Sequence, residues 1–266
     1  MLLARRALEN DGIVPYYQPK INLQTRQIVG WEALLRIRGE DDAILPPSEI
    51  ETAFSDTDLT VQITDRILSK VFADLAAWQR EGISPGRVAV NVSAGDFRHG
   101  NLADRLRLHA ARTGQAVSAV DIEVTETVLI SQLGSEVLKM IEELRGLGVT
   151  VALDDFGTGY ASLTHLQQIP VDAIKIDKSF VSQIGENDPK ATAVVDAVLQ
   201  MAKRLNMETI AEGVETSDQA RYLRARGCTT AQGYLFSRAV PSSEVGTTIS
   251  SKGYDEWQLE HTKQTT

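Results

Sequence analysis

The chain has 266 residues, of which 42% are hydrophobic and 24% charged, and its formal net charge is -9. This is ordinary composition for a globular protein. The acidic balance argues against binding to a nucleic-acid polymer or an anionic membrane, because both need basic patches. Cys228 is the only cysteine, so an intrachain disulfide is excluded and the reducing cytoplasm is the expected location.

Residues 1–12 are predicted to form a leading helix and not a secretion signal, because Arg5, Arg6 and Glu9 interrupt the apolar residues. No apolar run approaches the ~18 residues of a membrane span, so no membrane contact is expected. Helices are also predicted at 59–78 and 190–205, where apolar residues recur every three or four positions. Glycines are predicted to end four helices: Gly82, Gly114, Gly146 and Gly227.

Short apolar runs alternate with these amphipathic stretches and predict strands. The predicted strands are 14–23, 27–35, 88–92, 120–125, 149–153, 173–176, 208–211 and 229–232. Strands that alternate with helices predict an α/β fold with parallel pairing and a closed TIM-like (β/α)8 barrel.

The first two predicted strands depart from this rule. Only Gln24, Thr25 and Arg26 separate them, whereas a parallel crossover needs about a dozen residues or more. The first strand is therefore expected to be antiparallel. No Pro- or Ser-rich linker and no internal repeat divides the chain, so residues 1–250 are predicted as one barrel domain and 251–266 as a polar C-terminal tail.

Polar residues follow nearly every predicted strand, at the end where parallel barrels gather their functional side chains. An ordinary structural explanation exists for each position taken alone. The run Asp154-Asp155-Phe156-Gly157 fits a turn, and an acidic residue fits a helix N-terminus. The residues at these ends are Glu32, Asn91, Glu123, Glu126, Asp154, Asp155, Lys175, Asp177, Glu212, Glu215, Gln232 and Gly233.

Taken together, these strand ends predict a metal site. Carboxylates at such density are too costly to leave uncompensated. Two divalent cations, with Arg36 and Lys175, would bring the summed charge near zero. Ligands that are all oxygen favour Mg²⁺ or Mn²⁺ over zinc, and two such ions suit hydrolysis of a phosphate ester. The six carboxylates counted are Glu32, Glu123, Asp154, Asp155, Glu212 and Glu215.

Glu126 is predicted to act through a loop and not as a ligand. Strand alternation gives Glu123 and Glu126 opposite parity, so they should not serve the same ion. The loop at 156–162 is glycine-rich and needs a brace to hold Asp155 in place, which Glu126 could supply through the loop's backbone N–H groups or Thr158. The alternative is a solvated surface glutamate.

The chain resembles the EAL-domain family of bacterial cyclic di-GMP phosphodiesterases from about residue 3 to 247. Eight motifs occur in the family's order: YYQP, WEALLR, NVSAGDF, DIEVTET, LDDFGTGYASL, IKIDKSF, IAEGVET and QGYLFSRAVP. The family's fold is a (β/α)8 barrel with an antiparallel first strand. Two departures are local: Ile37 stands where the family often has an aromatic residue, and Gly95-Asp96 follow NVSA, where Asp96 could alter substrate contacts.

The resemblance also implies roles for individual residues. One ion would be held by Glu32, Asn91, Glu123 and Asp154, and Asp154 would bridge to a second ion that Asp155 also binds. Glu212 is implied as a ligand of the second ion or as the general base, and Lys175 as the group that holds the attacking water. Substrate-binding positions are Gln18, Leu34, Arg36, Asp177, Gln232 and Gly233; supporting positions are Gln232, Glu215, Glu126, Gly157 and Thr158.

The function implied is metal-dependent opening of cyclic di-GMP to linear pGpG. The alternatives are a non-catalytic receptor for cyclic di-GMP and a scaffold without nucleotide affinity. A complete metal-ligand set favours the enzyme. A homodimer, and sensor or cyclase domains in a longer protein, are partners that the resemblance implies.

Overall fold

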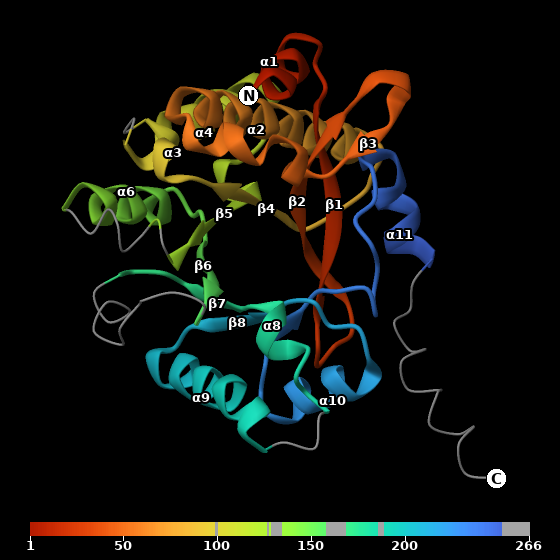
Figure 1. The fold of residues 1–266 in the computed structure, drawn as a ribbon, viewed down its shortest axis with the longest axis vertical. Helices are drawn as coiled ribbons and strands as arrows, with labels where there is room; N and C mark the ends of the chain where they lie inside the picture. Colours follow the sequence, from red (N-terminus) through yellow and green to blue (C-terminus); the bar gives the residue numbers. More distant parts are fainter. Residues whose placement is uncertain (99–100, 127, 129–134, 158–168, 186–188, 252–266) are drawn as a thin grey trace.

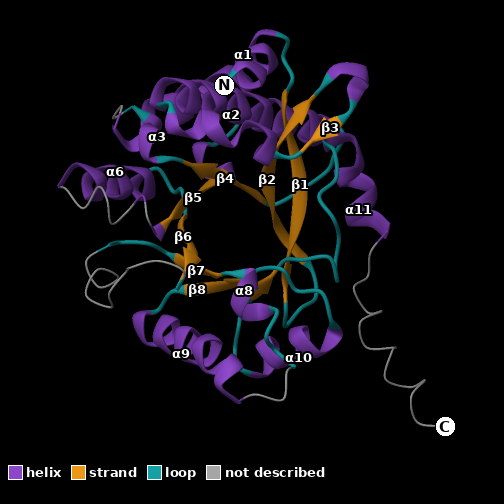
Figure 2. Ribbon diagram, viewed as in Figure 1, coloured by secondary structure: helices purple, strands orange, loops and turns teal. Residues whose placement is uncertain are grey.

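The computed structural model describes residues 1–98, 101–126, 128, 135–157, 169–185 and 189–251. In this part of the chain the strands close into one barrel and the helices lie outside it (Figure 1, Figure 2). The predicted α/β barrel is confirmed. The ring consists of β1 (Ile13–Asn22), β2 (Ile28–Arg38), β4 (Arg87–Val92), β5 (Val120–Thr125), β6 (Val151–Phe156), β7 (Ala173–Ile176), β8 (Glu208–Ala211) and β9 (Thr230–Ala231).

Strand β1 runs against both of its neighbours. It pairs antiparallel with β2 and β9, whereas the other ring strands pair with one another in parallel. The turn after β1 is stabilised by Asn22 Oδ1, which accepts hydrogen bonds from the backbone N–H groups of Gln24 and Thr25 at 2.9 and 2.8 Å. The predicted antiparallel first strand is therefore confirmed. A short strand, β3 (Ile44–Leu45), pairs antiparallel with the C-terminal end of β2 outside the ring.

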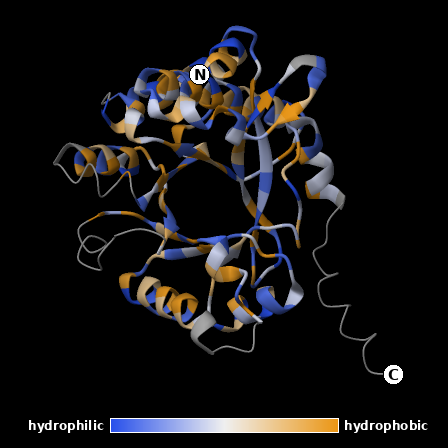
Figure 3. Ribbon diagram, in the orientation of Figure 1, coloured by the Kyte–Doolittle hydropathy of each residue, from blue (hydrophilic) through white to orange (hydrophobic). Residues whose placement is uncertain are grey.

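The helices are α1 (Leu2–Glu9), α2 (Thr57–Arg80), α3 (Ala94–Arg98), α4 (Leu102–Thr113), α6 (Ser135–Gly146), α8 (Lys178–Val181), α9 (Pro189–Leu205), α10 (Ser217–Ala225) and α11 (Val245–Ser251), with 3₁₀ turns η1 (Glu40–Asp42), η2 (Pro47–Ser55), η3 (Val117–Ala119) and η4 (Ser242–Glu244). Helices α2, α6 and α9 pack directly on the barrel strands, and α1 and α4 pack on α2. In Figure 3 the helices carry orange and blue residues side by side, as expected for helices with one buried side.

Strand alternation separates the main core from the barrel interior. In β5, Ile122 and Val124 belong to the main core, so Glu123 between them faces the interior. Three inward residues, Ala152, Ala173 and Ile210, form a small apolar cluster of their own. Each lies two positions before a polar strand-end residue, so this cluster is a floor beneath the polar layer.

Several predicted boundaries were wrong. Strand β6 continues past residue 153 to Phe156, β2 extends to Arg38, and α1 is shorter than 1–12. Gly146 is still helical, and the left-handed residue after α6 is Gly148, with a φ of +79°. Gly114, in contrast, caps α4 with a φ of +71°, as predicted.

The C-terminal tail stays a prediction, because residues 252–266 lie outside the described part of the chain. Ser251, the first residue of the predicted tail, still belongs to α11. Among the described residues, no helix is long and apolar enough to cross a membrane.

Candidate active site

Lys175, on β7, lies at the point where the carboxylates of four other strands converge. Its side chain is 1% exposed. Its Nζ is 2.7 Å from Glu123 Oε2 and from Glu212 Oε1, 3.1 Å from Asp154 Oδ2, and 3.5 Å from Glu32 Oε1. The structure thus brings together five residues that the strand-end argument selected separately.

Burial in this cluster shifts the pKa values strongly. Burial alone would lower the pKa of Lys175, but the surrounding carboxylates raise it well above its usual range. Burial raises the pKa of Glu212 to about 8, and also raises the pKa values of Glu32 and Asp154. Only Glu123 moves the other way: against the effect of burial, Lys175 and Lys20 lower its pKa to about 2. The cluster therefore carries more carboxylate than its own cations neutralise.

A bulge in β6 explains how two adjacent aspartates serve one site. The register between β6 and β7 shifts between Leu153 and Phe156. Within this bulge Asp155 has a left-handed backbone with a φ of +55°, and its N–H donates to Asp154 Oδ1 at 2.8 Å. In a regular strand the two side chains would point to opposite faces, and the bulge re-aims one of them.

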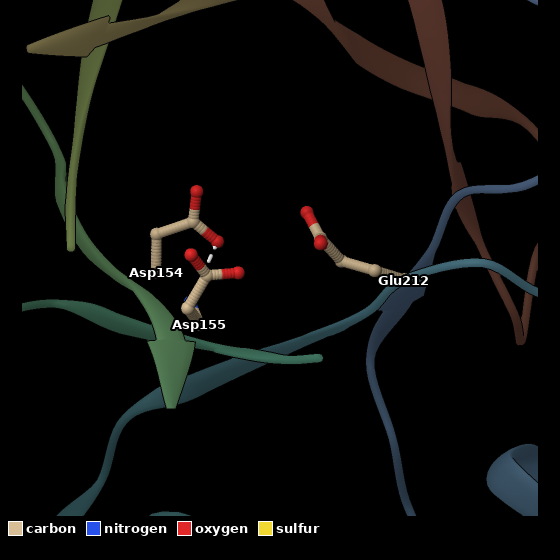
Figure 4. Close-up of side chains that lie close together, drawn as sticks. All are labelled: Asp154, Asp155 and Glu212. Atoms are coloured by element: carbon tan, nitrogen blue, oxygen red, sulfur yellow. Dashed lines mark hydrogen bonds between the residues drawn. The ribbon is translucent and has the colours of Figure 1, made fainter. Parts of the chain in front are cut away.

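The bulge places Asp154 and Asp155 beside Glu212. Figure 4 shows the two aspartates on β6 with Glu212 reaching toward them from beyond β8. One oxygen of each of the three carboxylates lies within 4.8 Å of the others. Burial raises the pKa of Asp155, and the charge of Asp177 adds to the effect. This geometry suits a divalent cation with oxygen ligands.

Two amide side chains hold Glu32 in place. Asn91 Nδ2 donates to Glu32 Oε1 at 2.8 Å, and Gln232 Nε2 donates to Glu32 Oε2 and to Glu212 Oε1. Gln232 Oε1 is buried and has no hydrogen-bond partner among the described residues. A buried acceptor without a partner is costly unless a donor or a cation binds it.

Lys20, on β1, is a member of this cluster that the sequence argument missed. It is 8% exposed, and its Nζ donates to Glu123 Oε1 at 2.6 Å. The strand-end argument considered the C-terminal ends of parallel strands, and Lys20 lies near the C-terminal end of the reversed strand, away from that rim. Its alternation with Tyr16 and Gln18 along β1 was a signal that could have found it.

A cavity of about 520 Å³ opens beside the cluster. Its polar wall includes Arg36, Asn91, Asp154 and Asp155, and Leu34 also lines it. Apolar side chains from β2, η2 and α2 form its apolar wall, among them Leu35, Pro47, Phe54, Ile63 and Ile67. A second cavity, of about 580 Å³, lies at the N-terminal ends of the strands, beside Arg145, Asp172 and Glu208. It is away from the carboxylate cluster around Lys175.

Glu126 contacts the segment that follows Asp155. Its Oε2 accepts a hydrogen bond from the backbone N–H of Gly157 at 3.2 Å, and the residue is only 3% exposed. Gly157 has a φ of +95°, which few residues other than glycine adopt. A solvated surface glutamate is therefore excluded. Thr158, the other predicted partner, lies outside the described residues.

Other predicted positions lie at the edge of the cluster. Gln18 pairs with Glu32 across β1 and β2, but its Nε2 donates to Ser237 O at 3.0 Å. Asp177 caps α8, accepting from Ser179 N at 3.0 Å. Gly233 packs on the backbone of Val214, where a Cβ would come within 2.2 Å of Val214 O.

Glu215 is not part of the buried cluster. It is exposed, and it precedes the capping box of α10, in which Thr216 and Gln219 satisfy each other's backbone N–H groups. This position fits the helix-terminus explanation better than a contact with the carboxylates. A supporting role for Glu215 stays a prediction.

Asp96 does not line the cavity itself but is bound to Thr64 and Ser93, which do, so the expected effect of Asp96 on substrate contacts stays a prediction. It is 0% exposed. Its Oδ2 accepts from Thr64 Oγ1, Ser93 N and Ser93 Oγ, and its Oδ1 accepts from Arg105 NH1 at 2.7 Å. Both carboxylate oxygens are thus used within the protein, and Asp96 joins α2, α3 and α4.

The sequence of this barrel is similar to those of known proteins. The bifunctional diguanylate cyclase/cyclic di-GMP phosphodiesterase MucR of Pseudomonas aeruginosa is 34% identical over 241 residues, which are 91% of this chain and 35% of MucR. A cyclic di-GMP phosphodiesterase of the same organism is 38% identical over 231 residues, which are 86% of this chain and 38% of the relative. The chain thus spans about a third of the length of the curated relatives it matches.

A solved structure gives the same result for the fold. A structure described as the PaMucR phosphodiesterase in complex with c-di-GMP superposes with a TM-score of 0.83 at 34% identity, covering 91% of this chain and 97% of the other. The family model described as the EAL domain matches residues 3–239. The carboxylate cluster, the reversed first strand and these matches agree, and the chain belongs to the EAL-domain family.

Proposed function

We propose that this chain is a metal-dependent phosphodiesterase that opens cyclic di-GMP to linear pGpG. The observation that carries the proposal is the convergence of Glu32, Glu123, Asp154 and Glu212 on Lys175, with Asp155 alongside. Relatives named as cyclic di-GMP phosphodiesterases, and a related structure described as a c-di-GMP complex, support the choice of substrate.

The residues present fit two Mg²⁺ or Mn²⁺ ions. Every candidate ligand atom is an oxygen, three carboxylates offer oxygens within 4.8 Å of one another, and Gln232 Oε1 is a buried acceptor without a partner in the described part of the chain. One ion would be held by Glu32, Asn91, Glu123 and Asp154. The other would be held by Asp154 and Asp155, with Glu212 as a further ligand unless it acts as the base. When bound, the ions would polarise the phosphate and lower the pKa of the attacking water.

The chain's own side chains would supply the remaining steps. Lys175 Nζ, at the centre of the cluster, would hold the attacking water and stabilise the negative charge that develops on the phosphoryl group. If Glu212 is not a ligand, it would accept the water's proton. The new bond joins the water oxygen to phosphorus and the bond from phosphorus to the 3′-oxygen breaks. The proton that the water gives up, to Glu212 or to bulk solvent, is balanced by the proton that the leaving 3′-oxygen takes up from the same source.

The cavity beside the cluster has the walls that a dinucleotide needs. Arg36 offers a cation to a phosphate, and the apolar wall formed by Leu35, Pro47 and Phe54 offers contact area for a base. Gln18, Leu34, Asp177, Gln232 and Gly233 are proposed as further substrate contacts. Arrangement as a homodimer and attachment to sensor or cyclase domains belong to the same proposal, and a longer relative named as a bifunctional diguanylate cyclase supports the attachment to a cyclase.

The test is incubation of the purified chain with cyclic di-GMP and Mg²⁺, Mn²⁺ or Ca²⁺, followed by chromatography of the products. Linear pGpG should form with Mg²⁺ or Mn²⁺ and poorly with Ca²⁺, which prefers longer and looser coordination. Excess chelator should stop the reaction. Nucleotide binding without turnover would favour the non-catalytic receptor, and no nucleotide binding would favour a scaffold.

A further inference from the structure

Lys20 approaches the carboxylate cluster from the floor of the barrel. Its Cα pairs with Gly30, two positions before Glu32 on β2, so it lies nearer the N-terminal ends of the parallel strands than the carboxylates do. The side chain is nine-tenths buried, and its Nζ reaches Glu123 Oε1 at 2.6 Å. Lys20 thus reaches Glu123 from the side opposite to the cavity rim, and the mechanism proposed above assigns Lys20 no role.

Glu123 is consequently held from two sides. Lys20 binds Oε1 at 2.6 Å, and Lys175 binds Oε2 at 2.7 Å. The two lysines differ in their surroundings. Lys175 Nζ also contacts Glu32, Asp154 and Glu212, whereas Glu123 is the acceptor recorded for Lys20 in the described part of the chain. Oε2 therefore faces the other carboxylates, and Oε1 faces the floor.

We propose that Lys20 is a positioning residue that keeps Oε1 of Glu123 away from the cation, so that Glu123 is a ligand through one oxygen only. The consequence is a preference between ions. Mg²⁺ and Mn²⁺ suit compact coordination with one oxygen from each carboxylate, whereas Ca²⁺ accepts more oxygens and often binds both oxygens of a carboxylate. Lys20 would thus disfavour Ca²⁺. This inference rests on the metal site of the proposed function.

A role in charge balance alone makes a different prediction. Ca²⁺ and Mn²⁺ carry the same charge, so loss of the Lys20 cation would change both affinities by a similar factor. The ratio of the two affinities is insensitive to that change. It is sensitive to whether Glu123 can turn and offer both oxygens.

The experiment is calorimetric titration of the wild type and of Lys20→Met with MnCl₂ and with CaCl₂, without nucleotide. Lys20→Met removes the donor and keeps most of the volume. The ratio of Ca²⁺ affinity to Mn²⁺ affinity should rise by about tenfold, the scale on which residues behind a metal ligand act. Lys20→Arg should keep the ratio near that of the wild type. Lys203→Met, at an exposed position on α9, is the matched control and should change neither affinity.

An unchanged ratio in Lys20→Met would overturn the inference, and so would a Lys20→Arg ratio shifted as far as that of the methionine variant. If Lys20→Met does not fold, Lys20→Gln gives the same test with a polar side chain too short to reach Oε1. If the wild type binds neither ion, the proposed metal site itself fails, which is a separate result.

Discussion

The mouth of the barrel and the helical layer beside it both bury charged side chains, but they balance the charges differently. At the mouth, four carboxylates surround Lys175 with Asp155 alongside, and burial raises the pKa values of Glu32, Asp154 and Asp155. In the helical layer, Asp96 and Asp65 both pair with Arg105, and Asp65 also contacts His109 Nε2 at 3.0 Å.

The pKa values record the same difference. The hydrogen bond with His109, together with Arg105, lowers the pKa of Asp65 to about 2 despite partial burial. The helical cluster thus stabilises the ionised form of Asp65, whereas the mouth leaves most of its carboxylates in need of further positive charge. A balanced buried cluster contributes to the fold, and an unbalanced one indicates a site for a ligand. The two clusters should therefore respond in opposite ways to substitution.

The largest effect is expected from Asp96→Asn in the helical layer. The variant leaves Arg105 with less compensation in a buried position, and loss of one partner of a buried pair costs about 3 to 5 kcal/mol. Urea unfolding should show this loss, while turnover per folded molecule stays near wild type. Asp104→Asn, in an exposed pair with Arg107, is the control and should cost little. Loss of turnover with an unchanged free energy of unfolding would contradict the assignment of a purely structural role to Asp96.

At the mouth, Asp155→Asn should have the opposite pattern. Turnover should fall at least ~10²-fold, the scale of removing one strong electrostatic stabiliser, because the second ion loses a ligand. Binding of cyclic di-GMP should survive. The unfolding free energy without metal should stay the same or rise, since one of several like charges is removed.

The control for this variant is Asp42→Asn. Asp42 has nearly the same backbone, with a φ of +56°, but its side chain is 90% exposed. Turnover close to wild type in Asp155→Asn would contradict the assignment of Asp155 as a ligand.

A smaller effect is expected from Glu126→Ala. Loss of the hydrogen bond to Gly157 N should let Asp155 shift, and a displacement of about 1 Å can cost up to ~10²-fold in rate. We expect kcat to fall by about one to two orders of magnitude, with affinity for the first ion near normal. Glu126→Gln keeps an acceptor oxygen and should lose less. Loss of the first ion, measured by titration, would make Glu126 a ligand instead.

The smallest effect is the pH dependence of Asp65. Its pKa in the folded chain, about 2, is below the usual 3.8, so ionised Asp65 contributes stability above pH 3.8 that is lost as the pH falls toward 2. Its side chain is 46% exposed, so solvent screening limits the contribution to about 1 kcal/mol or less. Unfolding of the wild type and Asp65→Asn should therefore differ at pH 6 and converge near pH 2. A constant difference would exclude this pairing as the cause.

Much of the architecture could be predicted from the sequence because strand periodicity and connection lengths are local. The three-residue connection at 24–26 was enough to predict the reversed strand. Lys175 and the carboxylates that surround it could also be predicted, since the C-terminal ends of parallel strands meet at one rim. Their individual roles stay predictions.

The rest depends on contacts between distant segments. The role of Asp96 is set by Arg105 on another helix, and that pairing leaves no periodic signal in the sequence. Lys20 acts across the barrel, from β1 to β5, through a long flexible side chain. The bulge at Asp154 and Asp155 could not be distinguished from a strand end, because both place an irregular residue after an apolar run.

The left-handed backbone at Asp155 has a consequence for mutational scanning. Aspartate, asparagine and glycine enter this conformation readily, whereas most other residues add strain of roughly 1 to 3 kcal/mol. An alanine scan would therefore report backbone strain and lost chemistry together at this one position. In a saturation library selected only for folding, Asp155→Asn and Asp155→Gly should be enriched, and selection for turnover should then remove both. The two selections together would therefore separate the residues that the backbone at this position tolerates from the side chain that turnover requires.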